Sequence, residues 1–251
     1  MSEREGDLQL ARSLVDEARR IVVMSGAGIS TDSGIPDFRG PNGLWTKNPA
    51  AERMSNLRAY VGSREVRAQS WQARLAHPVW QAEPNAGHRA VLALERDGRL
   101  LAIVTQNIDG LHQRAGSDPA TVIELHGTMS ETECLGCGDR QPMSATLERV
   151  GAGEDDPPCL LCSGILKSAT ISFGQPLDRR VLDRAQRAVR SADLLLAVGT
   201  SLTVHPAAGL VGVAVEIGTD LVVCNGSKTP YDDHAAVVLR NPLGEVLPAL
   251  V

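Results

Sequence analysis

The sequence predicts an α/β fold in which a doubly wound parallel sheet is covered by helices on both faces. Short, continuous runs of Val, Ile and Leu alternate with helical stretches, which is the pattern of strands buried on both faces. The first of these runs ends in a glycine-rich loop, and two segments interrupt the alternation. At 251 residues the chain can bury a substantial core and fits one large domain with a small insert.

The expected elements alternate along the chain. Strands are predicted at residues 21–25, 101–105, 121–125, 194–198, 220–224 and 236–240. Helices are predicted near residues 7–19, 86–97, 178–190, 206–216 and 243–250.

Two insertions break this alternation. Segment 41–85 has a helical pattern around 63–75 and no predicted strand, and segment 130–167 contains four paired cysteines. We therefore expect a Rossmann-like domain formed by residues 1–40, 86–129 and 168–251. The two insertions are expected to form a smaller domain beside it.

Composition and charge narrow the functional classes. The apolar content of 43% and charged content of 22% are ordinary for a globular protein, and the net charge of −5 argues against nonspecific nucleic-acid binding. No apolar run approaches the roughly 20 residues that cross a bilayer. The polar N-terminus lacks the apolar core of a signal peptide. We expect a cytoplasmic protein without membrane contact and without direct nucleic-acid binding.

The first predicted strand ends in a loop, residues 26–30, that reads Gly-Ala-Gly-Ile-Ser. Glycines let the backbone approach a phosphate closely, and the N–H groups at a helix start favour an anion, so a dinucleotide pyrophosphate fits. Residues 34–40 add an acid, an aromatic ring and a guanidinium, which phosphate binding alone does not require. The acid expected about 20 residues on, at the end of a second strand, is missing, so a nicotinamide oxidoreductase is not favoured.

Four of the five cysteines form two Cys-x-x-Cys pairs separated by 21 residues. In a chain without a secretion signal this spacing indicates metal binding rather than disulfides. Four thiolates around Zn²⁺ leave no open coordination position, so the expected role is structural. Segment 130–167 is thus a predicted zinc-binding insert, with a redox pair or unrelated thiols as alternatives; its ligands are Cys134, Cys137, Cys159 and Cys162. Cys224 lies in a predicted strand and is expected to be an inert core thiol.

Polar side chains follow several predicted strands at their carboxyl ends, where open α/β sheets bind ligands. The segment Gln106-Asn107-Ile108-Asp109 could bind ribose hydroxyls and a carboxamide, or form an ordinary Asx turn. His126 follows strand 121–125, and its ordinary pKa of about 6.5 suits a general base, although a lone histidine is more often structural. The loops after strands 194–198 and 220–224 could hold the second half of a dinucleotide, or be plain connections.

Taken in order, these motifs resemble the sirtuins, which are NAD-dependent protein-lysine deacylases. The ordered set comprises residues 26–30, 34–39, 105–112 and 125–127, the cysteine pairs, Phe173-Gly174, residues 199–202 and Asn225. The resemblance covers the chain from about residue 10 to its C-terminus. The chain resembles a sirtuin catalytic core of bacterial type.

The resemblance implies how the chain would bind NAD. The residues implied to hold the pyrophosphate are Gly26, Ala27, Gly28, Ser30 and Thr31. Those of the mobile loop over the nicotinamide ribose are Ile35, Asp37, Phe38 and Arg39. Those around the ribose and nicotinamide are Gln106, Asn107, Ile108 and Asp109. Those on the adenosine side are Gly199, Thr200, Ser201 and Asn225.

The resemblance also implies a catalytic set and a substrate. His126 is the implied general base, with Asn107 and Asp109 beside it. A protein partner carrying acyl-lysine would lie as a strand between the segment of Phe173 and Gly174 and the loop of Val204 and His205. In the implied reaction nicotinamide would leave and the acyl oxygen would capture the ribose carbon. His126 would then take a proton from a ribose hydroxyl, which would attack the acyl carbon.

The implied products are free lysine, nicotinamide and O-acyl-ADP-ribose. NAD would be the co-substrate and Zn²⁺ a structural ion. A mono-ADP-ribosyltransferase or NAD hydrolase using the same site is the main alternative. A non-catalytic zinc module that binds partners is a second.

The chain departs from the family at three places. It has Lys167-Ser168 in place of an Arg-Pro pair, and Gln175 in place of a glutamate, so its peptide preference is open. Trp71-x-x-Arg74 occupies roughly the place of the Tyr-x-x-Arg pair of sirtuins that favour succinyl or malonyl groups. We expect Trp71 in the core and Arg74 as a solvated helix charge, with contact to an acidic acyl group as the alternative.

Overall fold

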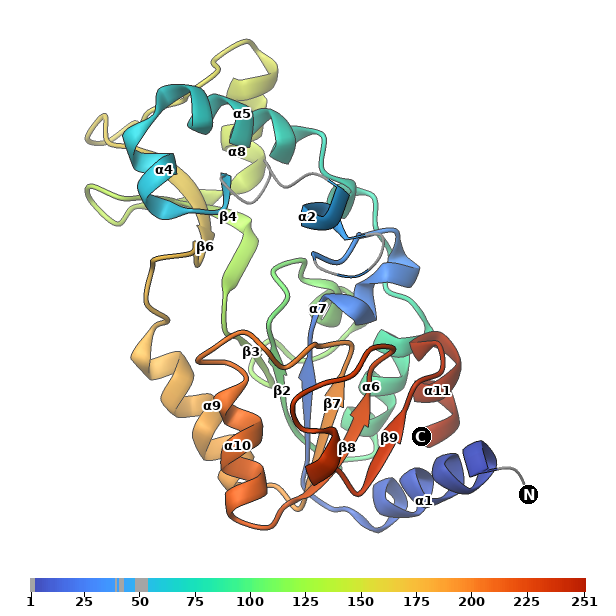
Figure 1. Ribbon diagram of the computed structural model, residues 1–251. Helices are drawn as coiled ribbons and strands as arrows, with labels where there is room; N and C mark the ends of the chain where they lie inside the picture. Colours follow the sequence, from blue (N-terminus) through green and yellow to red (C-terminus); the bar gives the residue numbers. More distant parts are fainter. Residues whose placement is uncertain (1–2, 39, 41–42, 48–53) are drawn as a thin grey trace.

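A parallel six-stranded sheet forms the larger lobe of the protein (Figure 1). The computed structural model describes residues 3–38, 40, 43–47 and 54–251. The strand order is β3-β2-β1-β7-β8-β9, and all neighbours are parallel. The chain direction across the sheet reverses between β1 and β7, which is where doubly wound sheets bind ligands. The predicted fold class is confirmed.

All six predicted strands are present. The strands are β1 (Ile21–Ser25), β2 (Leu100–Thr105), β3 (Val122–Glu124), β7 (Leu194–Val198), β8 (Asp220–Cys224) and β9 (Val237–Leu239). Successive residues point to opposite faces, so Ile21 and Val23 enter one apolar core while Val22 and Met24 enter the other. Both faces are buried, which explains why the runs lack polar alternation.

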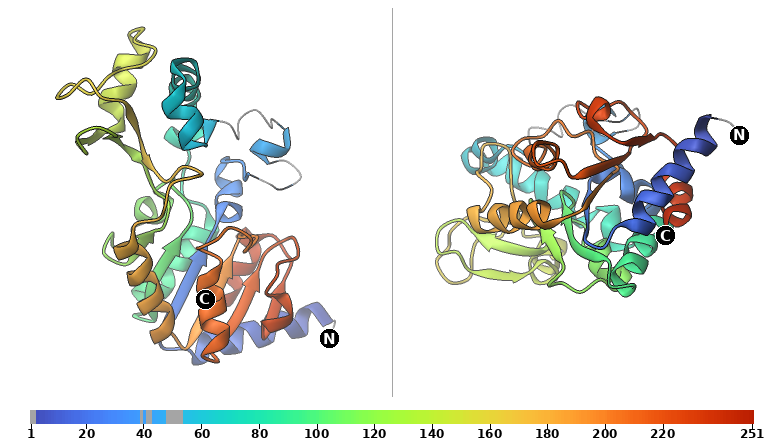
Figure 2. Two further views of the ribbon diagram at one scale, coloured as in Figure 1. Left: turned by 60° about the vertical axis from the view of Figure 1, so that its left-hand side comes forward. Right: turned by 90° about the horizontal axis from the view of Figure 1, so that it is seen from below.

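Helices cover both faces of this sheet (Figure 2). One face is covered by α1 (Glu3–Glu17), α6 (Ala86–Arg96) and α11 (Leu243–Leu250). The other is covered by α9 (Arg179–Ser191) and α10 (Gly209–Glu216). The five predicted helices are therefore present, with α10 beginning three residues later than expected because residues 205–208 form turns. No helix among the described residues is both long and apolar enough to cross a bilayer.

The two insertions lie together in a smaller lobe at one end of the molecule (Figures 1 and 2). The described part of 41–85 contains helices and no strand: α2 (Leu44–Lys47), α4 (Leu57–Gly62), α5 (Arg64–Leu75) and the short 3-10 helix η2 (Pro78–Trp80). The cysteine-bearing insert adds α8 (Met143–Gly151), which packs on α5. Trp71 is fully buried between these helices, as expected.

A three-stranded antiparallel sheet in this lobe was not predicted. Its order is β5-β4-β6, formed by β4 (Gly127–Cys134), β5 (Arg140–Pro142) and β6 (Leu166–Thr170). β4 and β6 run across the boundaries that we placed at 129/130 and 167/168, and so connect the lobes. The division into domains stays a prediction.

Arg67 joins the two insertions to each other. Its guanidinium makes a bidentate ion pair with Asp156, with N–O distances of 2.8 to 3.0 Å, and also donates to the carbonyl oxygens of Tyr60 and Val61. Both charged side chains are largely buried. A planar guanidinium bound in this way fixes the helical insert against the loop between the cysteine pairs.

Candidate active site

Five strand ends meet at one edge of the large sheet. The register pairs Ser25 of β1 with Thr105 of β2 and with Val198 of β7. It also pairs Thr105 with Glu124 of β3, and Val198 with Cys224 of β8. The loops that carry the predicted NAD-binding motifs therefore leave the sheet side by side.

The glycine-rich loop packs tightly against the loop after β7. It leads into a 3-10 helix, η1 (Ala27–Ser33), and Gly28 N donates to Gly199 O at 2.8 Å. A Cβ atom on Gly26 would lie 2.7 Å from Thr200 Cβ, and one on Gly28 would lie 2.7 Å from Gly199 Cα. Glycine is thus required at 26 and 28 by the neighbouring loop of the protein itself. Where the loops after β1 and β7 meet, the exposed groups are therefore backbone rather than side chains, as a pyrophosphate site requires.

Asn107 and Asp109 hold this loop in place. The Asn107 side chain is buried and donates from Nδ2 to Gly26 O and to Ser30 Oγ, both at 3.1 Å. Ser30 Oγ donates to Asp109 Oδ2 at 2.7 Å, while Asp109 Oδ1 accepts from Leu111 N. Burial raises the pKa of Asp109, and the hydrogen bonds from Leu111 and Ser30 oppose that shift. The structure brings these three predicted site residues together.

His126 has a fixed tautomer beside Gln106. Its Nδ1 lies 2.9 Å from Gln106 O, and because a carbonyl oxygen only accepts, Nδ1 carries the proton. Nε2 is left as the basic nitrogen. Burial lowers the pKa of His126, and the bond to Gln106 O partly opposes this. The Gln106 side chain donates from Nε2 to Thr200 Oγ1 at 2.8 Å, linking the β2 and β7 loops. A neutral imidazole with one free ring nitrogen is suited to accept a proton.

Three aromatic rings connect the predicted cofactor loop to the predicted substrate segment. The Trp45 ring lies 4.7 Å from that of Phe38 and 5.4 Å from that of Phe173, measured between centroids. Sequence reasoning did not assign Trp45 to the site. The sequence did contain a signal for Trp45. The chain has only seven aromatic residues (three Trp, two Tyr, two Phe), so an aromatic residue close to the predicted cofactor loop was a candidate for the site.

The other residues of the predicted cofactor loop differ in their surroundings. Ile35 is buried among Val79, Leu111 and Met129. Asp37 accepts from Gly40 N at 2.9 Å, which closes a tight turn. Arg39 lies outside the described residues. Ala27 and Ile108 are partly buried at the same edge of the sheet.

Several predicted ligand residues make local hydrogen bonds. Thr31 Oγ1 donates to Gly28 O, Ser201 Oγ lies 2.9 Å from Thr203 Oγ1, and Asn225 Nδ2 donates to Ser227 O. These bonds fix the three side chains along the edge where β1, β7 and β8 end. Their contacts to a dinucleotide stay a prediction.

The predicted substrate residues lie in two exposed segments. Phe173 exchanges backbone hydrogen bonds with the segment before α4, donating to Ser55 O and accepting from Leu57 N. Gly174 follows with a φ of +87°. Val204 is partly buried and His205 exposed, in the loop between β7 and α10. Their contact with a peptide stays a prediction.

A buried polar network below the site was also missed. His112 Nε2 lies 2.9 Å from Ser25 Oγ, which donates to Thr105 Oγ1, and that oxygen accepts from Asn107 N. His112 lies on α7 (Leu111–Ala115), and its ring packs edge-on against His88 with centroids 5.0 Å apart. The network ties Asn107 to helices on the far side of the strand ends.

The four paired cysteines converge in the small lobe. All four sulfurs lie within 4.8 Å of one another, with Cys134–Cys162 at 3.5 Å and Cys137–Cys159 at 3.7 Å. Tetrahedral Zn²⁺ with bonds of about 2.3 Å places sulfurs about 3.8 Å apart, whereas a disulfide requires about 2.05 Å. Backbone N–H groups of Gly136 and Leu161 donate to Cys134 Sγ and Cys159 Sγ. The donor set fits structural zinc, as predicted, and Cys224 is buried in β8.

Arg74 is not the solvated helix charge that we expected. Its Nη2 donates to Ser168 Oγ at 2.8 Å and its Nη1 to Ser70 O, and its Nε is buried. The guanidinium also lies 5.6 Å from the Trp71 ring centroid. The expectation was wrong because β6, which is 94 residues further along the chain, covers this face of α5.

Together these features define a class of protein. The features are a doubly wound sheet whose strand ends carry nucleotide-binding motifs, a partly buried histidine at those strand ends, and a lobe with four clustered cysteines that fit zinc. Such a set is typical of an NAD-binding enzyme core. Comparison with known proteins places the chain within that class. The Sir2 family model matches residues 26–206.

Relatives and solved structures agree with this match. A protein named NAD-dependent protein deacetylase 2 from Streptomyces coelicolor is 53% identical over 231 residues, covering 92% of this chain and 96% of its own. A structure described as a basis for the mechanism and regulation of Sir2 enzymes superposes with a TM-score of 0.89 at 37% identity, covering 98% and 97%. A Sir2 variant with deacetylated p53 peptide and 3′-O-acetyl ADP ribose gives 0.88 at 35%, covering 97% and 96%. The chain belongs to the Sir2 family.

Proposed function

We propose that this protein is an NAD-dependent protein-lysine deacylase that releases nicotinamide and O-acyl-ADP-ribose. The observation that carries the proposal is the tautomer of His126, which is fixed by Gln106 O and leaves Nε2 basic at the sheet edge. Similarity to a named deacetylase and to a Sir2 complex with acetyl ADP ribose supports the same reaction.

The residues of the sheet edge fit NAD. When bound, NAD supplies the ribose carbon that the acyl oxygen attacks as nicotinamide departs. The loop of residues 26–31 would hold the pyrophosphate, while Gln106 and Asn107 would face the ribose and Asp109 the nicotinamide. On the adenosine side the loop of residues 199–201 and Asn225 would make contact. His126 Nε2 would accept the proton of a ribose hydroxyl, because burial keeps the ring neutral.

We propose an acyl-lysine peptide as the second substrate. The peptide would add as a strand between Phe173-Gly174 and Val204-His205, since both segments are exposed and Phe173 already pairs by its backbone with the segment before α4. The p53 peptide in the related Sir2 complex supports a peptide partner. The acidic net charge of −5 supports protein rather than nucleic-acid partners.

The experiment is an incubation of the protein with NAD and a panel of acetyl-, propionyl-, succinyl- and long-chain-acylated lysine peptides. Mass spectrometry follows both peptide and nucleotide. We expect loss of the acyl group in a one-to-one ratio with nicotinamide and O-acyl-ADP-ribose. Nicotinamide release that is independent of peptide would indicate an NAD hydrolase, and protein carrying ADP-ribose without deacylated lysine would indicate a transferase.

A further inference from the structure

Lys167 is a buried cation for which the proposed chemistry has no use. It lies in β6, its side chain is 1% exposed, and in the described part of the chain it forms no ion pair with a carboxylate. Lysine is almost never fully buried without a partner because of the cost of removing its charge from water. The cost of burying this ammonium group must therefore be offset by favourable interactions in the folded protein.

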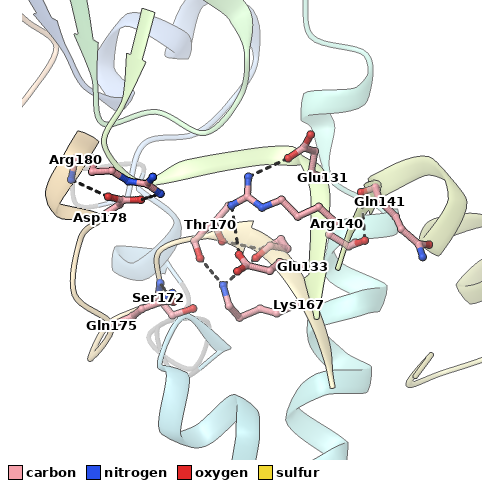
Figure 3. A network of polar contacts seen from close by, with 12 residues as sticks. Glu131, Glu133, Arg140, Gln141, Lys167, Thr170, Ser172, Gln175, Asp178 and Arg180 are labelled. Carbon is pink, nitrogen blue, oxygen red and sulfur yellow. Dashed lines mark hydrogen bonds and ion pairs between the residues drawn. The ribbon is translucent and has the colours of Figure 1, made fainter. Parts of the chain in front are cut away.

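The ammonium group satisfies the outer edge of β6. Its Nζ donates to Ser168 O at 2.8 Å and to Thr170 O (Figure 3). Ile165 O faces β4, where it accepts from Leu135 N, so the alternate carbonyls of residues 166, 168 and 170 face away from β4. The Tyr60 hydroxyl donates to the first of these, Leu166 O, at 2.8 Å. Buried carbonyl groups need hydrogen-bond donors. At this edge of β6, Lys167 donates to carbonyl oxygens that would otherwise accept from a neighbouring strand.

The carbonyls that Lys167 holds lie directly before the site. Thr170 pairs with Gly127, the residue after His126, and Ile171 N donates to His126 O at 2.8 Å. The pairing of β4 with β6 is irregular between Gly127 and Thr132, so the ladder itself gives this stretch little support. Two residues beyond Ile171, Phe173 begins the proposed substrate segment.

We propose that Lys167, as an ammonium ion, is a positioning residue that holds residues 168–171 of β6 so that His126 and the substrate segment keep their places. The inference rests on the proposed deacylation. The hydrogen bonds from an ammonium group to the carbonyls of Ser168 and Thr170 are charge-assisted and roughly twice as strong as those from a neutral amine. Loss of the proton would therefore loosen the stretch.

The surroundings of Lys167 make that loss accessible at mildly alkaline pH. Burial lowers its pKa to about 8; Arg74 on α5 and Arg140 on β5 lower it further, and Glu133 on β4 opposes them. Tyr60 on α4 faces the same edge, and burial raises its pKa above its usual range, so it stays neutral there. Arginine at 167 would stay charged throughout, because a guanidinium does not lose its proton in proteins.

The test compares Lys167→Arg with Lys167→Met and with the matched control Lys228→Arg, an exposed position far along the chain. The kcat/KM for an acetyl-lysine peptide is measured from pH 6 to 10. We expect an alkaline loss near pH 8 in the wild type and the control. In Lys167→Arg it should move up by at least one pH unit. Lys167→Met should lower kcat at pH 7 by about tenfold or more, because His126 would be misplaced, with the KM for NAD unchanged.

An alkaline loss at the same pH in Lys167→Arg, or a kcat for Lys167→Met within twofold of the wild type, would overturn the proposal. A second measurement is independent of how well the variants fold. The chain has only three lysines, Lys47, Lys167 and Lys228, so ¹³C-lysine NMR of the wild type gives three signals. We expect one to titrate near pH 8, and the His126 ring signal to shift over the same range. A His126 signal that does not follow that titration would equally overturn it.

These outcomes separate the two proposals. A wild-type protein that consumes no acyl-lysine would contradict the proposed function, whereas the coupled NMR titration still tests the link between Lys167 and His126.

Discussion

At the scale of single residues, the protonation state of His126 decides whether the proposed reaction can run. The Gln106 carbonyl fixes the proton on Nδ1, and burial keeps the ring neutral to lower pH than in water. A base whose pKa is lowered remains available through neutral pH and below it. The group that orients the base is thus the backbone carbonyl of Gln106, so a side-chain substitution at position 106 does not remove it.

His126→Ala should lower kcat by about 10²–10⁴-fold, because it removes the proton acceptor from the edge of the sheet. Activity of the wild type should fall on the acid side with a midpoint below pH 6.5, in line with the lowered pKa. Steady-state rates with an acetyl-lysine peptide from pH 5 to 8 check both expectations. His234→Ala, at an exposed position, serves as the control and should match the wild type. An acid midpoint above pH 6.5 would contradict a base whose pKa is lowered by partial burial.

Gly127 shows how tightly the residue after His126 is constrained. Its φ is +72°, and a Cβ atom there would lie 2.1 Å from Ala169 O. Gly98 has the same φ of +72° with nothing within 4 Å of a Cβ atom built on it, so it is a control for the backbone strain without the crowding.

Gly98→Ala should lower the free energy of unfolding by about 1–2 kcal/mol, the cost of a left-handed backbone for an L-residue. Gly127→Ala should cost about 1–3 kcal/mol more, because overpacking adds to the same strain. Urea unfolding of both variants measures the difference. Equal losses would mean that β4 and β6 separate without penalty at Gly127.

Some residues of the site could be predicted from sequence and others could not. Gln106, Asn107, Asp109 and His126 follow apolar runs, and the ends of parallel strands share one edge, so their proximity was readable. Arg74 and Lys167 were not. Arg74 is covered by β6, whose Ser168 is 94 residues away, and Lys167 lies among groups from α5, β4 and β5. A charged residue on a helix or short strand is ordinarily solvated, and nothing local marks the exception.

At the scale of elements, periodicity succeeded for the large sheet and failed for the small one. Each strand of the large sheet is a continuous apolar run, which local sequence displays. β4 carries Thr, Ser and Glu, and its buried residues, Met129, Thr132 and Cys134, do not alternate regularly because the register shifts within the strand. It pairs with β6 more than 30 residues away across the cysteine insert. Such a strand is defined by its partners and by the metal site rather than by its own composition.

Removal of zinc should unfold the small lobe before the large one. The cluster that includes Cys134 and Cys159 also holds Trp71, Met143 and Leu166, so the metal site and the small core form together. Chelation should abolish protection from hydrogen exchange in α5, α8 and β4 while β1 and β7 stay protected. Deacylation should be lost as well, because β4 begins at the residue after His126.

Cys162→Ser should reproduce the effect of chelation, whereas Cys224→Ala, a change to the one cysteine outside the cluster, should retain one zinc per chain. Metal analysis of the two variants makes this comparison. Full protection of α5 and α8 in metal-free protein would show that the lobe does not need the ion.

At the scale of the whole molecule, a buried histidine pair links helices to strands beneath the site. His88 on α6 and His112 on α7 are each at most 1% exposed. His88 Nδ1 accepts from Asn85 N, and His112 Nε2 meets Ser25 Oγ at the end of β1. The network thus connects α6 and α7 to the end of β1, at the edge of the sheet where we propose that NAD binds.

This pair makes stability depend on pH in a defined window. Burial lowers the pKa of His88 to about 4 and that of His112 to about 3. The unfolded chain, with a pKa near 6.5, binds more protons than the folded one in this range, so the free energy of unfolding falls as the pH falls below 6.5. Each histidine contributes a slope approaching about 1.4 kcal/mol per pH unit between about pH 5.5 and its folded pKa.

Urea unfolding of the wild type between pH 6.5 and 4.5 should therefore show a steep fall in the free energy of unfolding. In His88→Gln, the share of this fall that is due to the two histidines should be about half as large. Carboxyl groups with shifted pKa values, such as Asp109, are common to both proteins and cancel in the difference between them. At pH 7 the variant should be less stable than the wild type, since it loses the buried ring, and the two curves should converge as the pH falls. Parallel curves would mean that His88 takes up its proton as readily in the folded protein as in the unfolded chain, and that the pair is not held neutral by the fold.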